Sequence, residues 1–213
     1  MNCCFCRKIF FPVFLLLASL TLTGKEQTYP AAVKEYDLNI PYKDEALSLT
    51  FPGKIGEFVK RFVRVNANER IGTSIHYRCG GGISADIYLY LPEHQQGEKT
   101  SDILQKNYRA AKHLLFTMEQ AKKREDMPRK EEDFFREVPP KNAVAVNSVA
   151  FTFTAGEETF QSFLSMTSKE NGNVRRLVKI RFSYPAELGK EGEKKWEFFS
   201  EEILKILFPG KEK

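Results

Sequence analysis

Residues 72–91 contain the pattern that most restricts how this chain can fold. Two runs of alternating apolar and polar residues stand on either side of three consecutive glycines, Gly80, Gly81 and Gly82. This alternation has the period of a half-buried strand, and glycines between two strands are typical of a turn. The segment therefore predicts a β-hairpin within a sheet. Its two faces are expected to carry Ile75, Tyr77, Ile83, Ala85, Ile87, Leu89 and Leu91 on one side, and His76, Arg78, Ser84, Asp86, Tyr88 and Tyr90 on the other.

The start of the chain has the features of a secretory signal peptide. Arg7 and Lys8 precede an apolar run at 9–22, and a polar segment follows at 23–26. The run is shorter than the roughly 20 residues that span a bilayer. We therefore expect residues 1–24 to direct export to the periplasm or the extracellular space. The alternative is an uncleaved segment that anchors the protein to the membrane.

Cysteine usage and charge narrow the possible classes of protein. Three of the four cysteines lie within the predicted signal peptide, so Cys79 is the one cysteine of the expected mature chain. A lone cysteine forms no intramolecular disulfide, and the domain must be held by its core. Removal of Arg7 and Lys8 lowers the formal net charge from +5 to +3. This excess is too small to predict nucleic-acid binding.

The rest of the chain is predicted to form one domain at 46–208, between an irregular leader at 25–45 and a polar tail at 209–213. Alternating or β-branched runs predict further strands at 46–51, 57–65, 144–154, 159–167 and 174–183. The run at 57–65 also fits a helical face, but its β-branched residues favour the strand. Asn171-Gly172 is the strongest turn signal, because both residues tolerate the positive φ of a type I′ turn. In the strand that follows, the residues expected inside are Val178, Ile180 and Phe182, and those expected in solvent are Lys179 and Arg181.

Two amphipathic helices are also predicted. The first begins at Asp102, after the capping residue Ser101, and has an apolar stripe of Leu104, Tyr108, Ala111, Leu115 and Met118. The charged run at 122–133 is interpreted as its solvated extension, with a partner-binding segment as the alternative. The second helix spans 191–208 and has a stripe of Trp196, Phe199, Ile203, Ile206 and Leu207. That stripe is expected to pack against Phe151, Phe153, Phe160 and Phe182.

Strands in two meanders, each followed by a helix, predict an α+β fold. The expected architecture is a mostly antiparallel sheet packed against two main helices.

Three short motifs resemble known families. They are Phe51-Pro52-x-x-Ile55-Gly56-x-Phe58, Gly72-Thr73-Ser74-Ile75-x-Tyr77 and Ala85-x-Ile87-Tyr88-x-Tyr90. Together they are similar to a pattern in small exported bacterial proteins of unknown function. The order of elements also resembles the α+β sandwich of the photosystem accessory protein PsbP and of bacterial envelope relatives such as DcrB. The resemblance implies a fold and carries over no catalytic residue.

Catalytic and metal-binding patterns are scarce. The three histidines have neither each other nor a cysteine at metal-ligand spacing, and neither a P-loop nor a dinucleotide fingerprint is present. We therefore expect no metal and no cofactor. His76 and Cys79 are the one suggestive pair, but their spacing of three places them on opposite faces of an unbroken strand. The structural interpretation is a solvent-side histidine and a small core or turn cysteine.

Two classes of function remain open at this stage. The preferred one is a non-catalytic envelope protein that binds another protein or a small apolar ligand, with Arg78, Tyr88 and Tyr90 as the candidate binding residues. If a helix covers that face, the two tyrosines are instead amphipathic core residues. The alternative class is a hydrolase-like enzyme that uses Cys79 and His76, or an unrecognised carboxylate pair.

Overall fold

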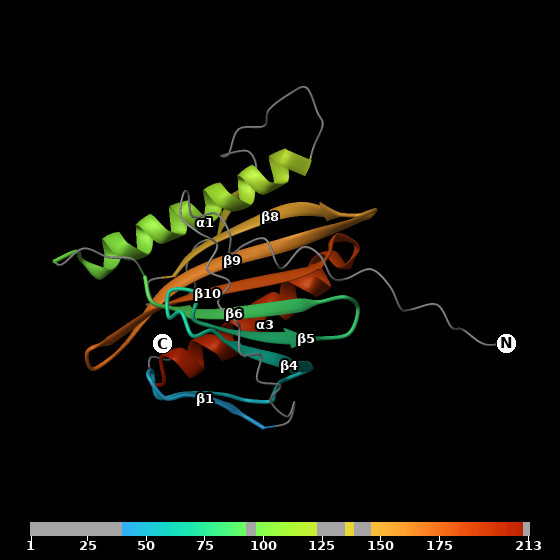
Figure 1. Cartoon of the computed structure of the whole chain (residues 1–213). Coiled ribbons are helices and arrows are strands. Elements are labelled where there is room, and N and C mark those ends of the chain that lie inside the picture. The colour runs from blue at the N-terminus through green and yellow to red at the C-terminus, as the bar shows by residue number, and fades with distance from the viewer. Residues whose placement is uncertain (1–39, 93–96, 123–134, 139–145, 211–213) are drawn as a thin grey trace.

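The computed structural model of the chain describes residues 40–92, 97–122, 135–138 and 146–210 (Figure 1). Its centre is an eight-stranded antiparallel sheet. In spatial order the strands are β3 (Lys54–Ile55), β4 (Phe58–Val65), β5 (Thr73–Arg78), β6 (Ser84–Tyr90), β10 (Val174–Pro185), β9 (Glu158–Asn171), β8 (Asn147–Ala155) and β7 (Arg136–Val138). The order consists of two meanders, β3 to β6 and β7 to β10, joined where β6 pairs with β10. Within each meander, strands that are neighbours in the sheet are also consecutive in the sequence.

Two long helices pack against opposite faces of this sheet. The helix α1 (Thr100–Lys122) contacts β8 and β9, while α3 (Gly189–Leu207) contacts β10. In Figure 1, α1 runs along the β8 side of the sheet and α3 passes behind the strands. The predicted α+β fold, with a mostly antiparallel sheet built from two meanders and packed against two main helices, is confirmed.

The predicted hairpin at residues 72–91 is present as β5 and β6. Ile75 lies opposite Ile87 and Tyr77 lies opposite Ala85, so the apolar positions share one face. Gly81 and Gly82 both have positive φ at the exposed turn, which only glycine adopts without strain. The alternating pattern therefore predicts both strands and the face that their apolar residues share.

The larger apolar core lies between the sheet and α3. Trp196 stacks on Phe163, with ring centroids 4.9 Å apart and an interplanar angle of 11°. Phe199 contacts Phe58 at 4.8 Å between centroids. Gly192 lets the helix approach closely, because a Cβ at that position would lie 2.2 Å from the Tyr184 ring. The apolar stripe predicted for this helix is therefore buried against the sheet.

A second core lies on the other face of the sheet, under α1. Its buried members are Leu104, Tyr108, Phe135, Val149, Phe151, Leu164, Met166 and Leu177. The expectation that Phe151, Phe153 and Phe160 would pack against the last helix is wrong. These rings belong to the α1 face, where Phe153 stacks on Phe160, while Phe163 projects to the α3 side in their place. Successive residues of a strand point to opposite faces, so Phe160 and Phe163 cannot share one.

A small two-stranded sheet, made of β1 (Tyr42–Asp44) and β2 (Leu49–Phe51), lies beside α3. The sequence pattern predicts a strand over 46–51 and an irregular leader up to Glu45. Instead, residues 45–48 form a turn, in which the Asp44 carboxylate accepts a hydrogen bond from the Leu47 amide at 2.9 Å. Local capping by an Asp side chain is a known alternative to strand pairing. The leader therefore ends in β1, and the expected strand is shorter.

The other predicted strands and helices occur with shifted ends. The helix expected from Asp102 begins at Thr100, the one expected from 191 begins at Gly189, and β7 was not predicted. The predictions for residues 1–39, 123–133 and 211–213 lie outside the described residues. Among the described residues, no helix is both long enough and apolar enough to cross a membrane.

Candidate functional site

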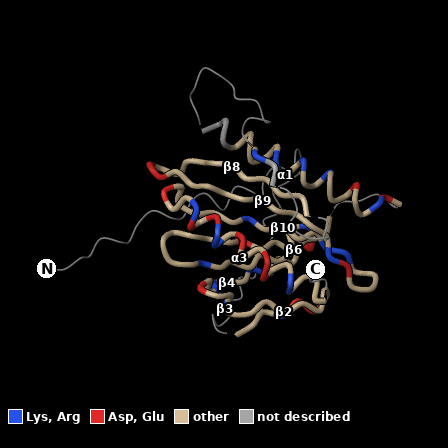
Figure 2. Tube along the Cα trace, turned by 180° about the vertical axis from the view of Figure 1, so that it is seen from behind, with Lys and Arg blue, Asp and Glu red and all other residues tan. Residues whose placement is uncertain are grey.

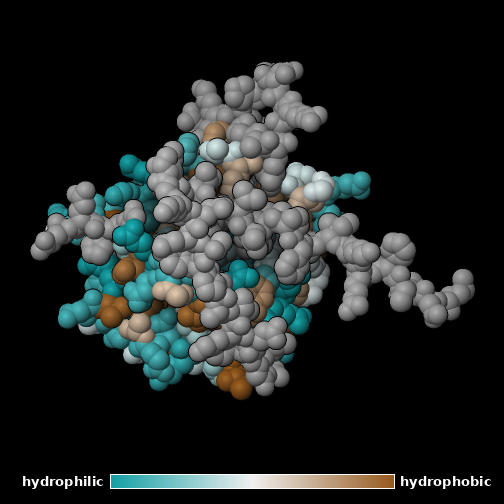
Figure 3. All heavy atoms as spheres, viewed as in Figure 1, coloured by the Kyte–Doolittle hydropathy of each residue, from teal (hydrophilic) through white to brown (hydrophobic). Residues whose placement is uncertain are grey.

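The most polar part of the sheet interior lies on the α1 face, over strands β4, β5, β6 and β10. Because α1 packs on β8 and β9, this area lies to one side of the helix. We call it the polar sheet face. Its side chains are Phe62, Arg64, Ser74, His76, Arg78, Ser84, Asp86, Tyr88, Lys179 and Arg181. Figure 3 shows the molecule from the same side as Figure 1, and the described atoms visible around its periphery are mostly hydrophilic, with separate hydrophobic spots.

A buried polar chain crosses the middle of this face. Asp86 and His76 are each 5% exposed, and they lie opposite one another on β6 and β5. His76 Nδ1 bonds the Asp86 carboxylate, and Arg78 Nε donates to His76 Nε2 at 3.1 Å. His76 Nδ1 thus faces the Asp86 carboxylate, and Nε2 faces the Arg78 guanidinium. Both ring nitrogens are therefore already engaged.

An aromatic side chain lies beside this chain of polar groups. Phe62 of β4 stacks on the His76 ring, with centroids 4.8 Å apart and an interplanar angle of 17°. It remains 36% exposed, which makes it one of the few large apolar side chains at the surface. The guanidinium carbon of Arg64 lies 5.9 Å from the Phe62 ring centroid. An exposed ring beside a cation can contact both apolar and charged groups of a ligand.

Lys179 and Tyr88 form the next feature, where β10 pairs with β6. The Lys179 ammonium lies over the Tyr88 ring, 4.4 Å from its centroid. Burial, followed by repulsion from Arg181, lowers the pKa of Lys179 from 10.5 to about 8. Burial, followed by the charge of Asp86, raises the pKa of the Tyr88 hydroxyl. The face thus holds a cation that water solvates poorly beside a tyrosine that stays neutral.

The three candidate binding residues all point to this side of the sheet, but they have different surroundings. Arg78 is exposed and bonds His76, and Tyr88 lies beneath Lys179. Tyr90 instead packs against the α1 core, as the covered-face interpretation expects. The expectation of a solvent-side His76 is wrong, because Asp86 and Phe62 bury its ring.

Sequence reasoning missed Arg64 as a site residue and assigned Lys179 and Arg181 to solvent. All three lie on the polar sheet face, where Lys179 and Arg181 are largely buried. Alternation along the strands could have indicated these positions. In both β4 and β10, basic residues occupy positions between buried apolar ones.

Cys79 lies elsewhere, among residues of the α3 side. Its thiol donates to Glu57 at 3.5 Å, and Lys195 of α3 donates to the same carboxylate oxygen at 2.5 Å. The hydrogen bond from Lys195, followed by that from Cys79, lowers the pKa of Glu57. Burial, followed by the hydrogen bond to Glu57, raises the pKa of the Cys79 thiol. The structure does not bring Cys79 and His76 together, and it disfavours the reactive thiolate.

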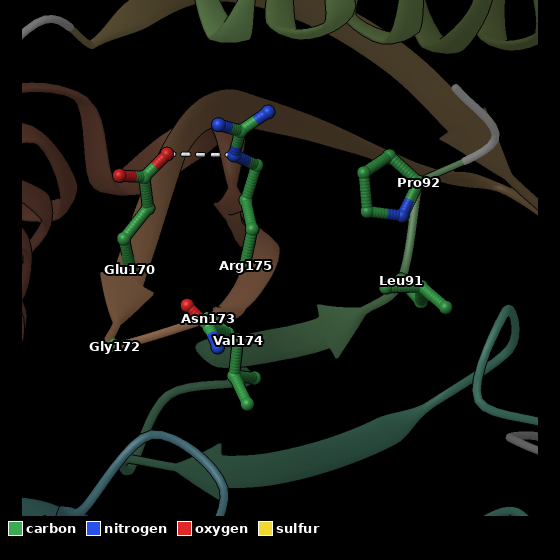
Figure 4. Close-up of a pocket in the computed structure, with 7 residues that line it drawn as sticks. All are labelled: Leu91, Pro92, Glu170, Gly172, Asn173, Val174 and Arg175. Atoms are coloured by element: carbon green, nitrogen blue, oxygen red, sulfur yellow. Dashed lines mark hydrogen bonds and ion pairs between the residues drawn. The ribbon is translucent and has the colours of Figure 1, made fainter. Parts of the chain in front are cut away.

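A shallow hollow of ≈ 390 Å³ opens where the turn after β9 meets the end of β6 (Figure 4). Its lining residues are Leu91, Pro92, Glu170, Gly172, Asn173, Val174 and Arg175. Glu170 pairs with Arg175 at 2.6 Å and accepts a hydrogen bond from Thr100. The hydrogen bond from Arg175, followed by that from Thr100, lowers the pKa of Glu170. The charges of Glu170 and Arg175, both in the lining of the hollow, therefore neutralise each other.

Within the described ranges, no group of three or more His, Cys, Asp or Glu side chains is arranged to hold a metal ion. Comparison of the chain with protein-family models, with curated proteins and with solved structures gave no match. The resemblance to PsbP-like proteins therefore stays a prediction. The fold defines the class of protein as an α+β domain, in which a helix packs against each face of an antiparallel sheet. The polar sheet face is its candidate functional site.

Proposed function

We propose that this is an exported, non-catalytic binding protein and that the polar sheet face contacts its ligand. The observation that carries the proposal is the composition of this face. Exposed Phe62 and the cations Arg64, Arg78 and Lys179 lie together beside the part of the sheet that α1 covers. Exposed aromatic and arginine side chains that lie together are common at recognition sites. The partner is another protein or a small molecule with an apolar part that Phe62 contacts.

The geometry also supports binding over catalysis. The buried Asp86–His76 pair resembles half of a hydrolytic triad, but Arg78 occupies the ring nitrogen that would activate a nucleophile. The network instead links the two strands β5 and β6 through side-chain hydrogen bonds. Its expected role is to hold Phe62 and Arg78 in place on the face.

Phe62→Ser tests the proposal, and Phe198→Ser is the matched control. Phe198 of α3 is 43% exposed and packs near Gly56, away from the polar sheet face. Each purified variant, checked for folding by circular dichroism, is incubated with envelope extract of the native host. Cross-linking then detects bound proteins, and native mass spectrometry detects bound small molecules.

We expect Phe62→Ser to bind its partner or ligand about 5- to 30-fold more weakly, because an exposed aromatic anchor contributes about 1–2 kcal/mol to binding. Phe198→Ser should retain capture at the wild-type level. Equal capture by both variants would mean that the binding surface lies elsewhere on the molecule.

A further inference from the structure

Arg64 has a side-chain nitrogen that lacks a partner. Its Nε is buried and, among the described residues, is the one buried side-chain nitrogen or oxygen without a hydrogen bond. A buried donor on a charged group that makes no bond is costly, and native proteins avoid it. The position of this atom therefore indicates that an acceptor belongs beside it.

A second cation lies in the same row of the sheet. The strand register places Arg64, Ser74, Tyr88 and Lys179 side by side across β4, β5, β6 and β10. Three strand spacings separate the two cations, or roughly 14 Å between their backbones. Ser74 is small, and Lys179 leans over the Tyr88 ring. The two long side chains can therefore approach one acceptor above Ser74 and Tyr88.

The charge of this row is only partly compensated by its neighbours. In the adjacent row Asp86 lies opposite Arg181, so these two charges offset each other. Lys179 makes no described hydrogen bond or ion pair in the part of the chain that the structure covers, and its cationic contacts are the rings of Tyr88 and Tyr90. With Arg64 and Lys179 at one charge each, the row holds two positive charges. Burial and repulsion from Arg181 lower the pKa of Lys179, and the charge of Asp86 offsets only part of this effect.

We propose that the polar sheet face binds the phosphate group of a small phosphate monoester between Arg64 and Lys179. This proposal rests on the proposed function and names the class of ligand. A phosphate monoester carries a charge of about −1.5 to −2 at pH 7, which matches the two cations. Its oxygens supply the acceptor that Arg64 Nε lacks, and arginine binds phosphate through parallel N–H bonds. The adjacent Phe62 and Tyr88 rings would contact the organic part of the ligand.

Calorimetric titration of the full chain with phenyl phosphate and with inorganic phosphate, at low ionic strength, tests this site. The variants are Arg64→Gln and Lys179→Met, and Arg64→Lys keeps the charge without the Nε donor. The matched controls are Arg70→Gln, in the turn between β4 and β5, and Lys190→Met, on α3; both residues are exposed.

We expect saturable binding to the wild type and weakening of about tenfold or more in Arg64→Gln and in Lys179→Met, as loss of one charged hydrogen bond implies. Arg64→Lys should weaken binding less than Arg64→Gln does. The two controls should bind within about twofold of the wild type. Tighter binding of phenyl phosphate than of inorganic phosphate would show that the aromatic rings contact the ester.

Absence of phosphate binding to the wild type would overturn the inference. So would a loss of affinity in Arg70→Gln or Lys190→Met as large as in the site variants, because it would indicate adventitious attraction of an anion to a basic surface. If a site variant does not fold, the Arg64 Nε–H resonance of the wild type decides instead, because phosphate must shift it. Loss of partner capture in Phe62→Ser without any phosphate binding would leave the proposed function standing and this inference refuted. Phosphate binding without any effect of Phe62→Ser on capture would refute the proposed function and leave the phosphate site standing.

Discussion

Lys179 is a charged side chain on the polar sheet face, and its burial lowers the stability of the fold. It contacts the Tyr88 and Tyr90 rings through cation–π interactions at 4.4 and 5.9 Å. These contacts offset only part of the cost of removing an ammonium from water, and Arg181 adds repulsion. A charged group that costs stability and makes no described ion pair with the protein is typical of a ligand site.

We expect Lys179→Met to raise the free energy of unfolding at pH 7 by about 1–2 kcal/mol, because a buried charge is replaced by an apolar chain of similar length. The lowered pKa sets the pH dependence of this gain. Between pH 8 and 10.5 the unfolded state of the wild type binds more protons than the native state, so the wild type gains stability as the pH rises.

The advantage of Lys179→Met should therefore be largest below pH 8 and shrink toward pH 10. Urea unfolding of both proteins at pH 7, 8, 9 and 10 measures it. Tyr88 on the adjacent strand stays protonated through this range, because its pKa is raised, and so does not confound the comparison. A constant difference across these pH values would show that Lys179 has an ordinary pKa.

At the scale of elements, one helix packs against each face of the sheet, and the two helices contact different sets of strands. Five residues of α3 are buried, among them Trp196 and Phe199, and its stripe meets both strand meanders through Phe58 and Phe163. The helix α1 packs mainly on β8 and β9. The helix α3 therefore ties the two halves of the sheet together, and α1 closes one half of the opposite face.

Trp196→Ala should lower the free energy of unfolding by about 3–5 kcal/mol, because it leaves a cavity beside the Phe163 and Phe182 rings. Phe198→Ala on the same helix is the control, and a change within about 0.5 kcal/mol is expected there because the ring is 43% exposed. Chemical denaturation of the two variants gives both values. An unchanged midpoint for Trp196→Ala would mean that α3 docks only weakly in solution.

At the scale of the whole molecule, the sheet has two short edges and two covered sides. The outer strands β3 and β7 have only two and three residues, which limits edge-to-edge association. Seen from the α3 side in Figure 2, charges of both signs line that helix. The polar sheet face lies on the opposite side, so the molecule has a charged outer helix on one side and its candidate binding face on the other.

The export of this molecule is a prediction from the segment at 1–24, which lies outside the described residues. We expect this segment to be removed in the native host, because a charged start followed by an apolar run of 9–22 is recognised and cleaved during secretion. N-terminal sequencing of the mature protein determines its first residue. Recovery of Met1 from a membrane fraction would support the uncleaved anchor instead.

The sequence by itself determined the elements whose cause is local. Alternation within 72–91 predicts β5 and β6 with the correct faces, and the spacing of Trp196, Phe199 and Ile203 predicts the buried stripe of α3. Period two and period 3.6 are properties of the backbone, so they can be read from neighbouring residues. The class of fold follows from the order of these elements.

Only the tertiary structure decided which groups meet. Arg64 and Lys179 are far apart in the chain and share a row because β6 pairs with β10, and neither strand carries a local signal for that pairing. The pairing of β5 with β6 brings Asp86 beside His76, and the face that α3 covers places Trp196 against Phe163 rather than Phe160. Such contacts depend on the order of strands and on the face that each helix covers. Both are set by burial of the whole apolar surface, which no short window of sequence contains.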